Sequence, residues 1–281
     1  MDNFCIYFNW DPKLIQRTKT LDGPFGLWNK EVILFLEDSL EDSLEDFMET
    51  KKIAVVTGAN RGLGFEACRQ LAKKGYTVVL TSRDSKKGEA ATGRLRDEKL
   101  DVHFHQLDVT KTDSIKNFKE YVAKEFGRCD VLVNNAGILP DRGGSALDTP
   151  TDLLRTTLET NLFGPYQMIQ AFAPLMVKNN YGRIVNVSSG MGQLSEMGGN
   201  YPGYRTSKTA LNALTRIFSE ELADKDILVN SICPGWVKTD MGGAGAELEI
   251  TEGVDTIVWA ATLPKGSPTG SFFREREKID W

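Results

Sequence analysis

The stretch Lys52–Gly64, KIAVVTGANRGLG, decides the fold of this chain. Its residues 53–56 are apolar and flanked by polar residues, as in a buried strand of a parallel sheet. Gly58, Gly62 and Gly64 follow, and a helical pattern, FEACRQL, begins at residue 65. Glycines let a backbone turn tightly and approach a ligand, and a helix N-terminus presents free N–H groups to a pyrophosphate. This order predicts half of a dinucleotide-binding unit.

Strands alternate with helices from residue 51 onward. We expect strands at 53–57, 76–81, 102–106, 131–134, 183–188 and 228–232, and helices at 63–74, 86–98, 114–126, 152–177 and 204–223. The alternation predicts an α/β fold, a Rossmann-type doubly wound parallel sheet in three α/β/α layers within a single domain. Ligands of such sheets bind beyond the C-terminal ends of the strands, so the residues that follow each strand are the candidates for function.

The composition of the 281 residues is that of an ordinary globular protein, with 41% hydrophobic and 26% charged residues. The net charge of −5 gives no sign of nucleic-acid binding, and no apolar run reaches membrane-spanning length. The N-terminus lacks the pattern of a signal peptide. The four cysteines fit no zinc spacing, so we expect no metal site. Cys68 and Cys233 are expected to be buried free thiols, which indicates a reducing, cytoplasmic compartment.

Residues 1–47 differ from the rest of the chain. The first 50 residues hold 11 acidic and 4 basic residues, so the acidity of the chain is concentrated there. Within them Leu36–Phe47 reads LEDS-LEDS-LEDF, with apolar residues every three or four positions, as in one amphipathic helix. We interpret 1–47 as an acidic extension, either a docking helix or a disordered segment, ahead of a nucleotide-binding domain at 48–281.

Basic residues near the expected ribose site indicate the type of cofactor. Arg61 lies in the glycine turn, and Arg83 follows the second expected strand. Two basic groups favour the 2′-phosphate of NADP, whereas an acidic residue accepts the 2′-hydroxyl of NAD. The alternative is that Arg83 is solvated and Asp84 is the ribose ligand or a helix cap. Asp108, after the third strand, either bonds the adenine or caps the next helix.

A tyrosine and a lysine open the last long helix with the spacing of one helix face. Tyr204 and Lys208 are four residues apart. Free tyrosine has a pKa near ~10, and a neighbouring ammonium lowers that pKa. Ser189, after the fifth expected strand, can hydrogen-bond a carbonyl oxygen beside the phenol. The three residues predict general acid catalysis of carbonyl reduction.

These motifs together resemble the short-chain dehydrogenase/reductase family over roughly residues 51–281. They are TGANRGLG (57–64), NNAG (134–137), the serine after the fifth strand, YRTSK (204–208) and PGWVKT (234–239). The glycine turn, LTSRD (80–84) and the C-terminal Trp281 are most similar to the NADPH-dependent carbonyl reductases. The resemblance implies reduction of a ketone, aldehyde or quinone with NADPH. The alternatives are an NAD(P)-dependent alcohol dehydrogenase acting in the oxidative direction and a non-catalytic NADP-binding regulator.

The resemblance also implies roles for individual residues. Tyr204 is the acid/base, Lys208 lowers its pKa and binds the nicotinamide ribose, Ser189 orients the substrate, and Asn161 holds a proton-relay water. Besides Tyr204 and Lys208, the residues expected to contact the cofactor are Gly58, Asn60, Arg61, Gly62, Leu63, Gly64, Arg83, Asp108, Val109, Asn134, Ala136, Gly137, Pro234, Gly235, Val237 and Thr239.

One departure from the family bears on association. Monomeric animal carbonyl reductases carry a long helical insertion between this serine and this tyrosine, whereas only 14 residues, 190–203, intervene here. The expected helices 152–177 and 204–223 carry more apolar residues than one buried face needs, including Met168, Phe172 and Met176 on the first. In the family this helix pair forms a two-fold interface, so we expect a homodimer or a homotetramer.

The substrate is expected to be a small, mostly apolar molecule. The residues expected around its pocket are Met191, Leu194, Met197, Tyr201, Trp236 and Met241.

Overall fold

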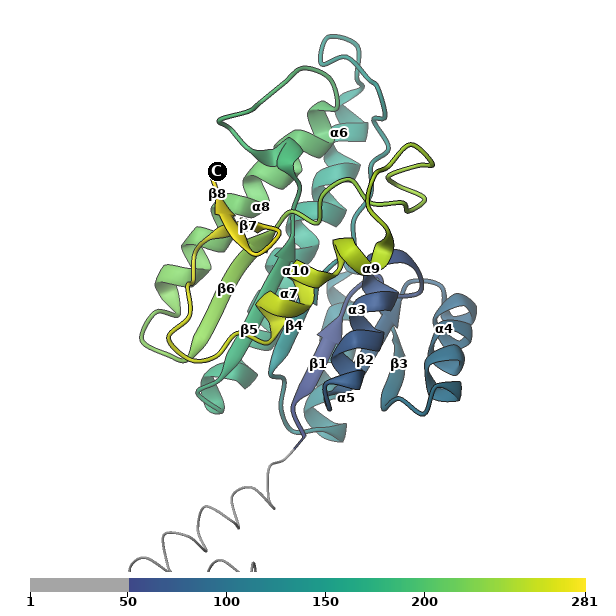
Figure 1. Cartoon of the computed structure of the whole chain (residues 1–281), viewed down its shortest axis with the longest axis vertical. Coiled ribbons are helices and arrows are strands. Elements are labelled where there is room, and N and C mark those ends of the chain that lie inside the picture. Colours follow the sequence, from purple (N-terminus) through teal and green to yellow (C-terminus); the bar gives the residue numbers. More distant parts are fainter. Residues whose placement is uncertain (1–50) are drawn as a thin grey trace, which may run out of the picture. The chain divides into compact units, whose positions relative to one another are not determined.

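The computed structural model describes residues 51–281, and the expectations for residues 1–47 lie outside this range. Its centre is an eight-stranded sheet in the order β3-β2-β1-β4-β5-β6-β7-β8 (Figure 1). The strands are β1 (Ile53–Val56), β2 (Thr77–Ser82), β3 (Val102–Gln106), β4 (Val131–Asn134), β5 (Gly182–Val187), β6 (Ile227–Ile232), β7 (Phe272–Arg274) and β8 (Glu277–Ile279). The predicted doubly wound sheet is confirmed, with the strand order reversing between β1 and β4.

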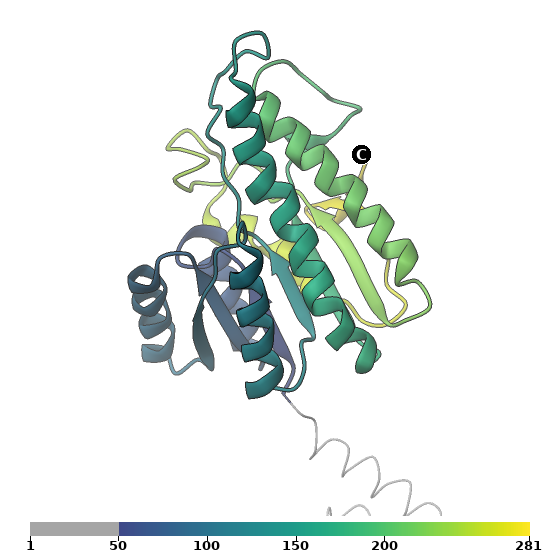
Figure 2. The ribbon, with the colours of Figure 1, turned by 180° about the vertical axis from the view of Figure 1, so that it is seen from behind.

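Helices cover both faces of the sheet, because the sheet is apolar on both sides. One core lies between the sheet and α3 (Gly62–Lys73), α4 (Ser85–Asp97) and α10 (Asp255–Ala261). The other lies beneath α5 (Thr112–Glu125), α7 (Gly164–Lys178) and α8 (Pro202–Glu221), which lie together on one face in Figure 2. The remaining α-helices of the described part are α6 (Thr151–Leu158) and α9 (Ile250–Gly253).

The helix expected at 152–177 is not continuous. A π-helical turn, Glu159–Phe163, separates α6 from α7. Pro165 lies just after this turn and has no N–H with which to close the α-type bond to the carbonyl of Asn161. Such turns are frequent at functional sites, and this one contains Asn161.

Of the six apolar residues expected on this helix, half lie in the core, whereas Leu154, Leu158 and Leu162 are partly exposed. Met168, Phe172 and Met176 are fully buried against the sheet. The apolar side chains exposed on α7, α8 and the π-turn are instead Phe163, Tyr166, Val177 and Ile217.

The end of the chain holds elements that the sequence pattern did not predict: α9, α10, β7 and β8. Strand β7 extends the parallel sheet, and β8 returns antiparallel to β7. Glu275 and Arg276 form the turn between them, with φ of 52° and 65°. Hairpin turns of this kind usually carry asparagine or glycine, so Glu-Arg gives no turn signal in the sequence.

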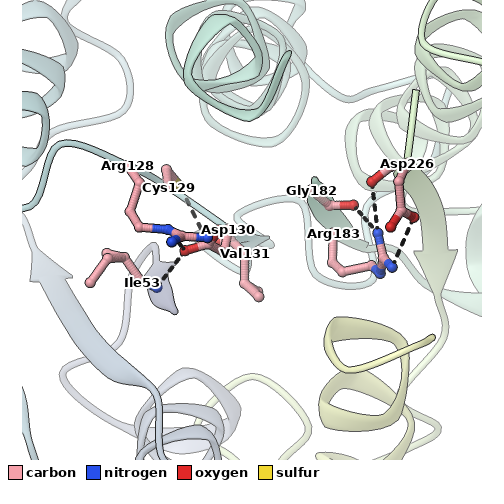
Figure 3. Close-up of polar contacts among 8 residues, drawn as sticks. All are labelled: Ile53, Arg128, Cys129, Asp130, Val131, Gly182, Arg183 and Asp226. Carbon is pink, nitrogen blue, oxygen red and sulfur yellow. Dashed lines mark hydrogen bonds and ion pairs between the residues drawn. The ribbon is translucent and has the colours of Figure 1, made fainter. Parts of the chain in front are cut away.

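Two ion pairs, Arg128 with Asp130 and Arg183 with Asp226, lie at the edge of the sheet where β1, β4 and β5 begin (Figure 3). The Asp130 carboxylate is fully buried and accepts hydrogen bonds from Ile53 N at 2.7 Å and from Arg128 Nε at 2.8 Å. Arg183 is 1% exposed, and its Nη2 lies 3.0 Å from Asp226 Oδ1. Because both groups lie where strands begin, the opposite edge is left for a ligand.

No helix among residues 51–281 has the length and apolar character needed to cross a membrane.

Candidate active site

A cleft of about 1270 Å³ runs along the edge of the sheet where β1 to β4 end, and we call it the first cleft. Its walls come from the loops after these strands, from the N-terminal part of α8 and from the loop after β6. It lies where the strand order reverses, the place at which doubly wound sheets bind nucleotides. The expected cofactor residues that line it are Gly58, Asn60, Arg61, Gly62, Leu63, Arg83, Asp108, Val109, Ala136, Gly137, Tyr204, Lys208, Pro234 and Thr239.

The glycine turn is shaped by close backbone packing. Gly58 has φ of +62°, and a Cβ there would lie 2.8 Å from Ala136 Cα. Gly64 does not line the cleft; a Cβ on it would lie 2.4 Å from Asn135 Nδ2. Gly64 therefore allows the turn to pack against the loop after β4. The contact with the cofactor expected for Gly64 stays a prediction.

The two asparagines after β4 have different roles. Asn134 is buried beneath the cleft and donates to Asn186 Oδ1 on β5 at 2.9 Å, so it joins strands and does not line the cleft. Asn135 lines the cleft and donates to the carbonyls of Thr57 and Gly58 at 2.8 and 3.0 Å. The expected contact of Asn134 with the cofactor stays a prediction, and its amide is already bonded to Asn186.

Basic residues gather at the end of the first cleft beside β2. Arg83 lines it, and so does Lys87, which the sequence analysis did not single out. Asp84 caps α4 by accepting a hydrogen bond from Lys87 N at 3.1 Å, so its role as a cap is observed. Arg61 forms an ion pair with Asp240 of the loop after β6.

Asp108 lies on the wall of the first cleft near this end. Its Oδ1 accepts hydrogen bonds from the backbone N and the hydroxyl of Thr110, at 3.0 and 2.7 Å. These bonds shape the loop after β3.

The predicted catalytic residues Ser189, Tyr204 and Lys208 come together where the first cleft meets a second one. Tyr204 lines both clefts and Ser189 lines the second, and the Ser189 side chain lies close enough to act on the pKa of the Tyr204 phenol. Lys208 is buried, with Nζ 5.6 Å from the centre of the Tyr204 ring and 2.7 Å from the carbonyl oxygen of Val187. The hydroxyl of the neighbouring Ser188 donates a hydrogen bond to the backbone carbonyl oxygen of Lys208 at 3.4 Å.

Burial dominates the ionisation of this group. Burial raises the pKa of Tyr204 to about 12, although the Ser189 side chain acts in the opposite direction. It lowers the pKa of Lys208 from its ordinary value of 10.5 to about 8. The pKa of Tyr204 in the protein without cofactor is thus raised overall, because removing the phenolate from water outweighs the effect of Ser189, and the expected lowering by Lys208 stays a prediction.

Asn161 does not line either cleft. It is fully buried, and its Oδ1 accepts from Ile138 N at 2.8 Å while its Nδ2 donates to Ile138 O at 2.9 Å and Ser207 Oγ at 3.1 Å. The side chain therefore joins the π-turn to the loop after β4 and to α8. The bond to Ser207 links Asn161 to the helix that carries Tyr204 and Lys208, and its expected part in holding a proton-relay water stays a prediction.

Asp141 was missed by the sequence analysis. Its buried carboxylate accepts hydrogen bonds from Gly203 N at 2.7 Å and Tyr204 N at 3.2 Å, so it caps the N-terminus of α8 from a distant loop. Its other oxygen is buried without a partner among the described residues. A cap from 62 residues away leaves no local signal in the sequence.

The second cleft has a volume of about 840 Å³ and opens beside Ser189 and Tyr204. Of the residues expected around the substrate, Met191, Tyr201, Trp236 and Met241 line it. Leu194 and Met197 do not; both are exposed on the loop that follows Gly192. Gly235 and Val237, expected to contact the cofactor, line this second cleft.

Among residues 51–281 no group of three or more His, Cys, Asp or Glu side chains is arranged to hold a metal ion.

Comparisons with known proteins show which family this chain belongs to. The family model for short chain dehydrogenases matches residues 52–249. A (+)-neomenthol dehydrogenase of Arabidopsis thaliana is 36% identical, covering 82% of this chain and 98% of the relative. Carbonyl reductase (NADPH) 1 of Bos taurus is 34% identical, with the same two coverages of 82% and 98%.

Solved structures are also similar to most of this chain. Salutaridine reductase from Papaver somniferum is 30% identical with a TM-score of 0.71, covering 80% of this chain and 100% of that protein. An actinorhodin polyketide ketoreductase variant solved with NADPH is 26% identical with a TM-score of 0.74, covering 80% and 95%.

Proposed function

We propose that this chain reduces the carbonyl group of a small ketone, aldehyde or quinone with NADPH. The chain belongs to the short-chain dehydrogenase family and is an NAD(P)-dependent oxidoreductase. The observation that carries the proposal is the meeting of Ser189, Tyr204 and Lys208 at the junction of two clefts. A cofactor in the first cleft and a substrate in the second would both reach the phenol of Tyr204.

The first cleft fits a dinucleotide with a 2′-phosphate. The backbone around Gly58 is close-packed where a pyrophosphate would lie, and the N-terminus of α3 follows it. Arg83 and Lys87 supply cationic groups beside the expected ribose site, which supports NADPH over NADH. When bound, NADPH supplies the hydride. Reductases whose names include NADPH are among the relatives.

The protein's own groups supply the proton and the positioning. Tyr204 donates its phenolic proton to the carbonyl oxygen as the oxygen gains charge, and Ser189 holds that oxygen by a hydrogen bond. The high pKa of Tyr204 keeps the phenol protonated at neutral pH, as a proton donor must be. Oxidation of an alcohol at the same site would need the phenolate. It is therefore the second candidate, supported by the dehydrogenase name of the Arabidopsis relative.

The test is Tyr204→Phe, assayed by NADPH absorbance against a panel of ketones, aldehydes and quinones. We expect turnover to fall by roughly 10²–10⁴-fold, because the proton donor is lost while the ring is kept. Binding of NADPH, followed by its fluorescence, should be retained. Tyr201→Phe, on the wall of the second cleft, should have a mild effect. Near-normal turnover of Tyr204→Phe on any good substrate would refute the assignment.

We further propose a homodimer or homotetramer formed across α7, α8 and the π-turn. Phe163, Tyr166, Val177 and Ile217 are exposed there, and Ile217 is 50% exposed. Closed two-fold assemblies are the commonest among soluble proteins.

We also propose a cytoplasmic location. Cys68, Cys129 and Cys233 are buried free thiols, which supports a reducing compartment.

A further inference from the structure

Three arginines, Arg142, Arg205 and Arg274, line the second cleft, where the proposed function places the substrate. Within residues 51–281 none of the three forms an ion pair with a carboxylate. Arg142 donates to the carbonyls of Asp240 and Met241, at 3.3 and 2.5 Å. Arg205 donates to backbone carbonyls of the loop at 191–200. The wall of a site expected to be mostly apolar thus carries three arginines that form no ion pair among the described residues.

Arg274 lies beside the segment that follows Ser189. It ends β7, and its Nε donates to Cys233 Sγ at 3.4 Å while its Nη2 donates to Gln193 Oε1 at 3.1 Å. A Cβ on Gly190 would lie 2.3 Å from Arg274 Nη2, so the guanidinium lies against the residue that follows Ser189. Its other N–H groups have no partner among the described residues.

The carboxylates around the second cleft lie further out. Glu247 and Glu275 line its rim and are exposed, whereas Arg274 is half-buried. Glu196 and Glu275 act on Arg274 electrostatically without contact. A half-buried guanidinium interacts more strongly with a charge than an exposed group does, because solvent screens it less. The inner part of the cleft therefore favours an anion.

Resting on the proposed function, we propose that the substrate is a carbonyl compound that carries a carboxylate, and that Arg274 binds this carboxylate. The carbonyl oxygen has to reach Ser189 and Tyr204, and the Arg274 guanidinium lies against Gly190, the residue that follows Ser189. The two groups of the substrate are then separated by only a few bonds. Arginine suits this role because its planar N–H groups bind a carboxylate in a bidentate manner. The carboxylate is unchanged by the reaction, in which the carbonyl gains a hydride and a proton.

Pairs of acids and esters test this directly. The probes are 2-oxo-2-phenylacetate and 4-oxo-4-phenylbutanoate, each compared with its methyl ester, with NADPH as reductant. We expect the wild-type protein to have a higher kcat/KM for at least one acid than for its ester. In Arg274→Gln the value for that acid should fall by about 10- to 150-fold, the range for a hydrogen bond to a charged group. The value for the ester should change by less than about threefold.

The matched control is Arg276→Gln. It makes the same change two residues away in the same hairpin, where the side chain pairs with Asp255 outside both clefts. We expect it to leave the kcat/KM of acid and ester unchanged. A parallel loss for acid and ester in Arg274→Gln would overturn the proposal and show that Arg274 only supports the fold.

Inhibition of the wild-type protein tests the same carboxylate site without any substitution. Benzoate should inhibit reduction of the ester competitively, and neutral benzamide should inhibit at least tenfold more weakly. Esters reduced as well as both acids, or equal inhibition by benzoate and benzamide, would overturn the inference and leave the proposed function standing. No oxidation of NADPH with any carbonyl compound would refute the proposed function and this inference together.

Discussion

Replacing Lys208 by methionine should stabilise the protein at neutral pH while removing its activity. Lys208 is buried, with 5% of its surface exposed, and its ammonium has one hydrogen bond among the described residues, to the carbonyl oxygen of Val187. Burial lowers its pKa from 10.5 to about 8, which means that folding destabilises the charged form. Methionine keeps the length of the side chain and removes the charge.

The pKa shift gives the size of the effect. At pH 7 lysine is protonated in both states, and the shift corresponds to about 3 kcal/mol of stability lost by the wild-type protein. Between about pH 8 and pH 10.5 the unfolded chain binds more protons at this lysine than the folded chain does. The stability contribution of Lys208 therefore rises with pH in this window, and at pH 10 less than about 1 kcal/mol of the cost is left. Loss of the bond to Val187 offsets about 1 kcal/mol of the gain at every pH.

The assay is urea unfolding of wild type and Lys208→Met at pH 7 and pH 10, without cofactor. We expect the unfolding free energy of Lys208→Met, relative to that of wild type, to be lower at pH 10 than at pH 7 by about 2.5 kcal/mol. Lys116→Met, on the exposed face of α5, is the control and should differ from wild type by no more than about 0.5 kcal/mol at both. A difference for Lys208→Met that does not change with pH would refute the reasoning.

Three further predictions concern the cofactor, the cap of α8 and the association of the chain. Arg83→Ala should weaken binding of NADPH and leave NADH nearly unchanged in fluorescence titrations; equal losses would show that Arg83 does not bind the 2′-phosphate. Asp141→Ala should lower unfolding free energy by about 2–4 kcal/mol, because two buried N–H groups lose their acceptor, whereas exposed Asp148→Ala should cost under about 0.5 kcal/mol. Ile217→Asp should shift light scattering toward the monomer, and a wild-type monomer at micromolar concentration would exclude the proposed interface.

The parts of this fold that could be predicted from sequence have short-range causes. The strand at 53–56, the turn and α3 follow from apolar runs, glycine conformations and helical periodicity, which act over a few residues. The placing of Tyr204 and Lys208 on one face of α8 likewise needs only the spacing of four. These features can therefore be predicted from the local sequence alone.

Short elements at the end of the chain were not predictable in the same way. Strand β8 is three residues long and forms by pairing with β7, across a turn whose Glu275 and Arg276 are unusual at positive φ. The π-turn at 159–163 is stabilised by Asn161, whose partners lie 23 and 46 residues away. Both depend on tertiary contacts and leave little pattern in the sequence.

The chemical character of the site shows the same division. The sequence by itself determined which residues are present to donate a proton and that they follow the ends of strands. Only the tertiary structure decided that Asn135 lines the first cleft while Asn134 joins strands, that Asp141 caps α8, and that Arg274 lies beside Ser189. It also decided that Tyr204 has a raised pKa. The physical reason is that burial and the electrostatic environment of a group are set by atoms from distant parts of the chain, whereas conformational preference is set by its neighbours.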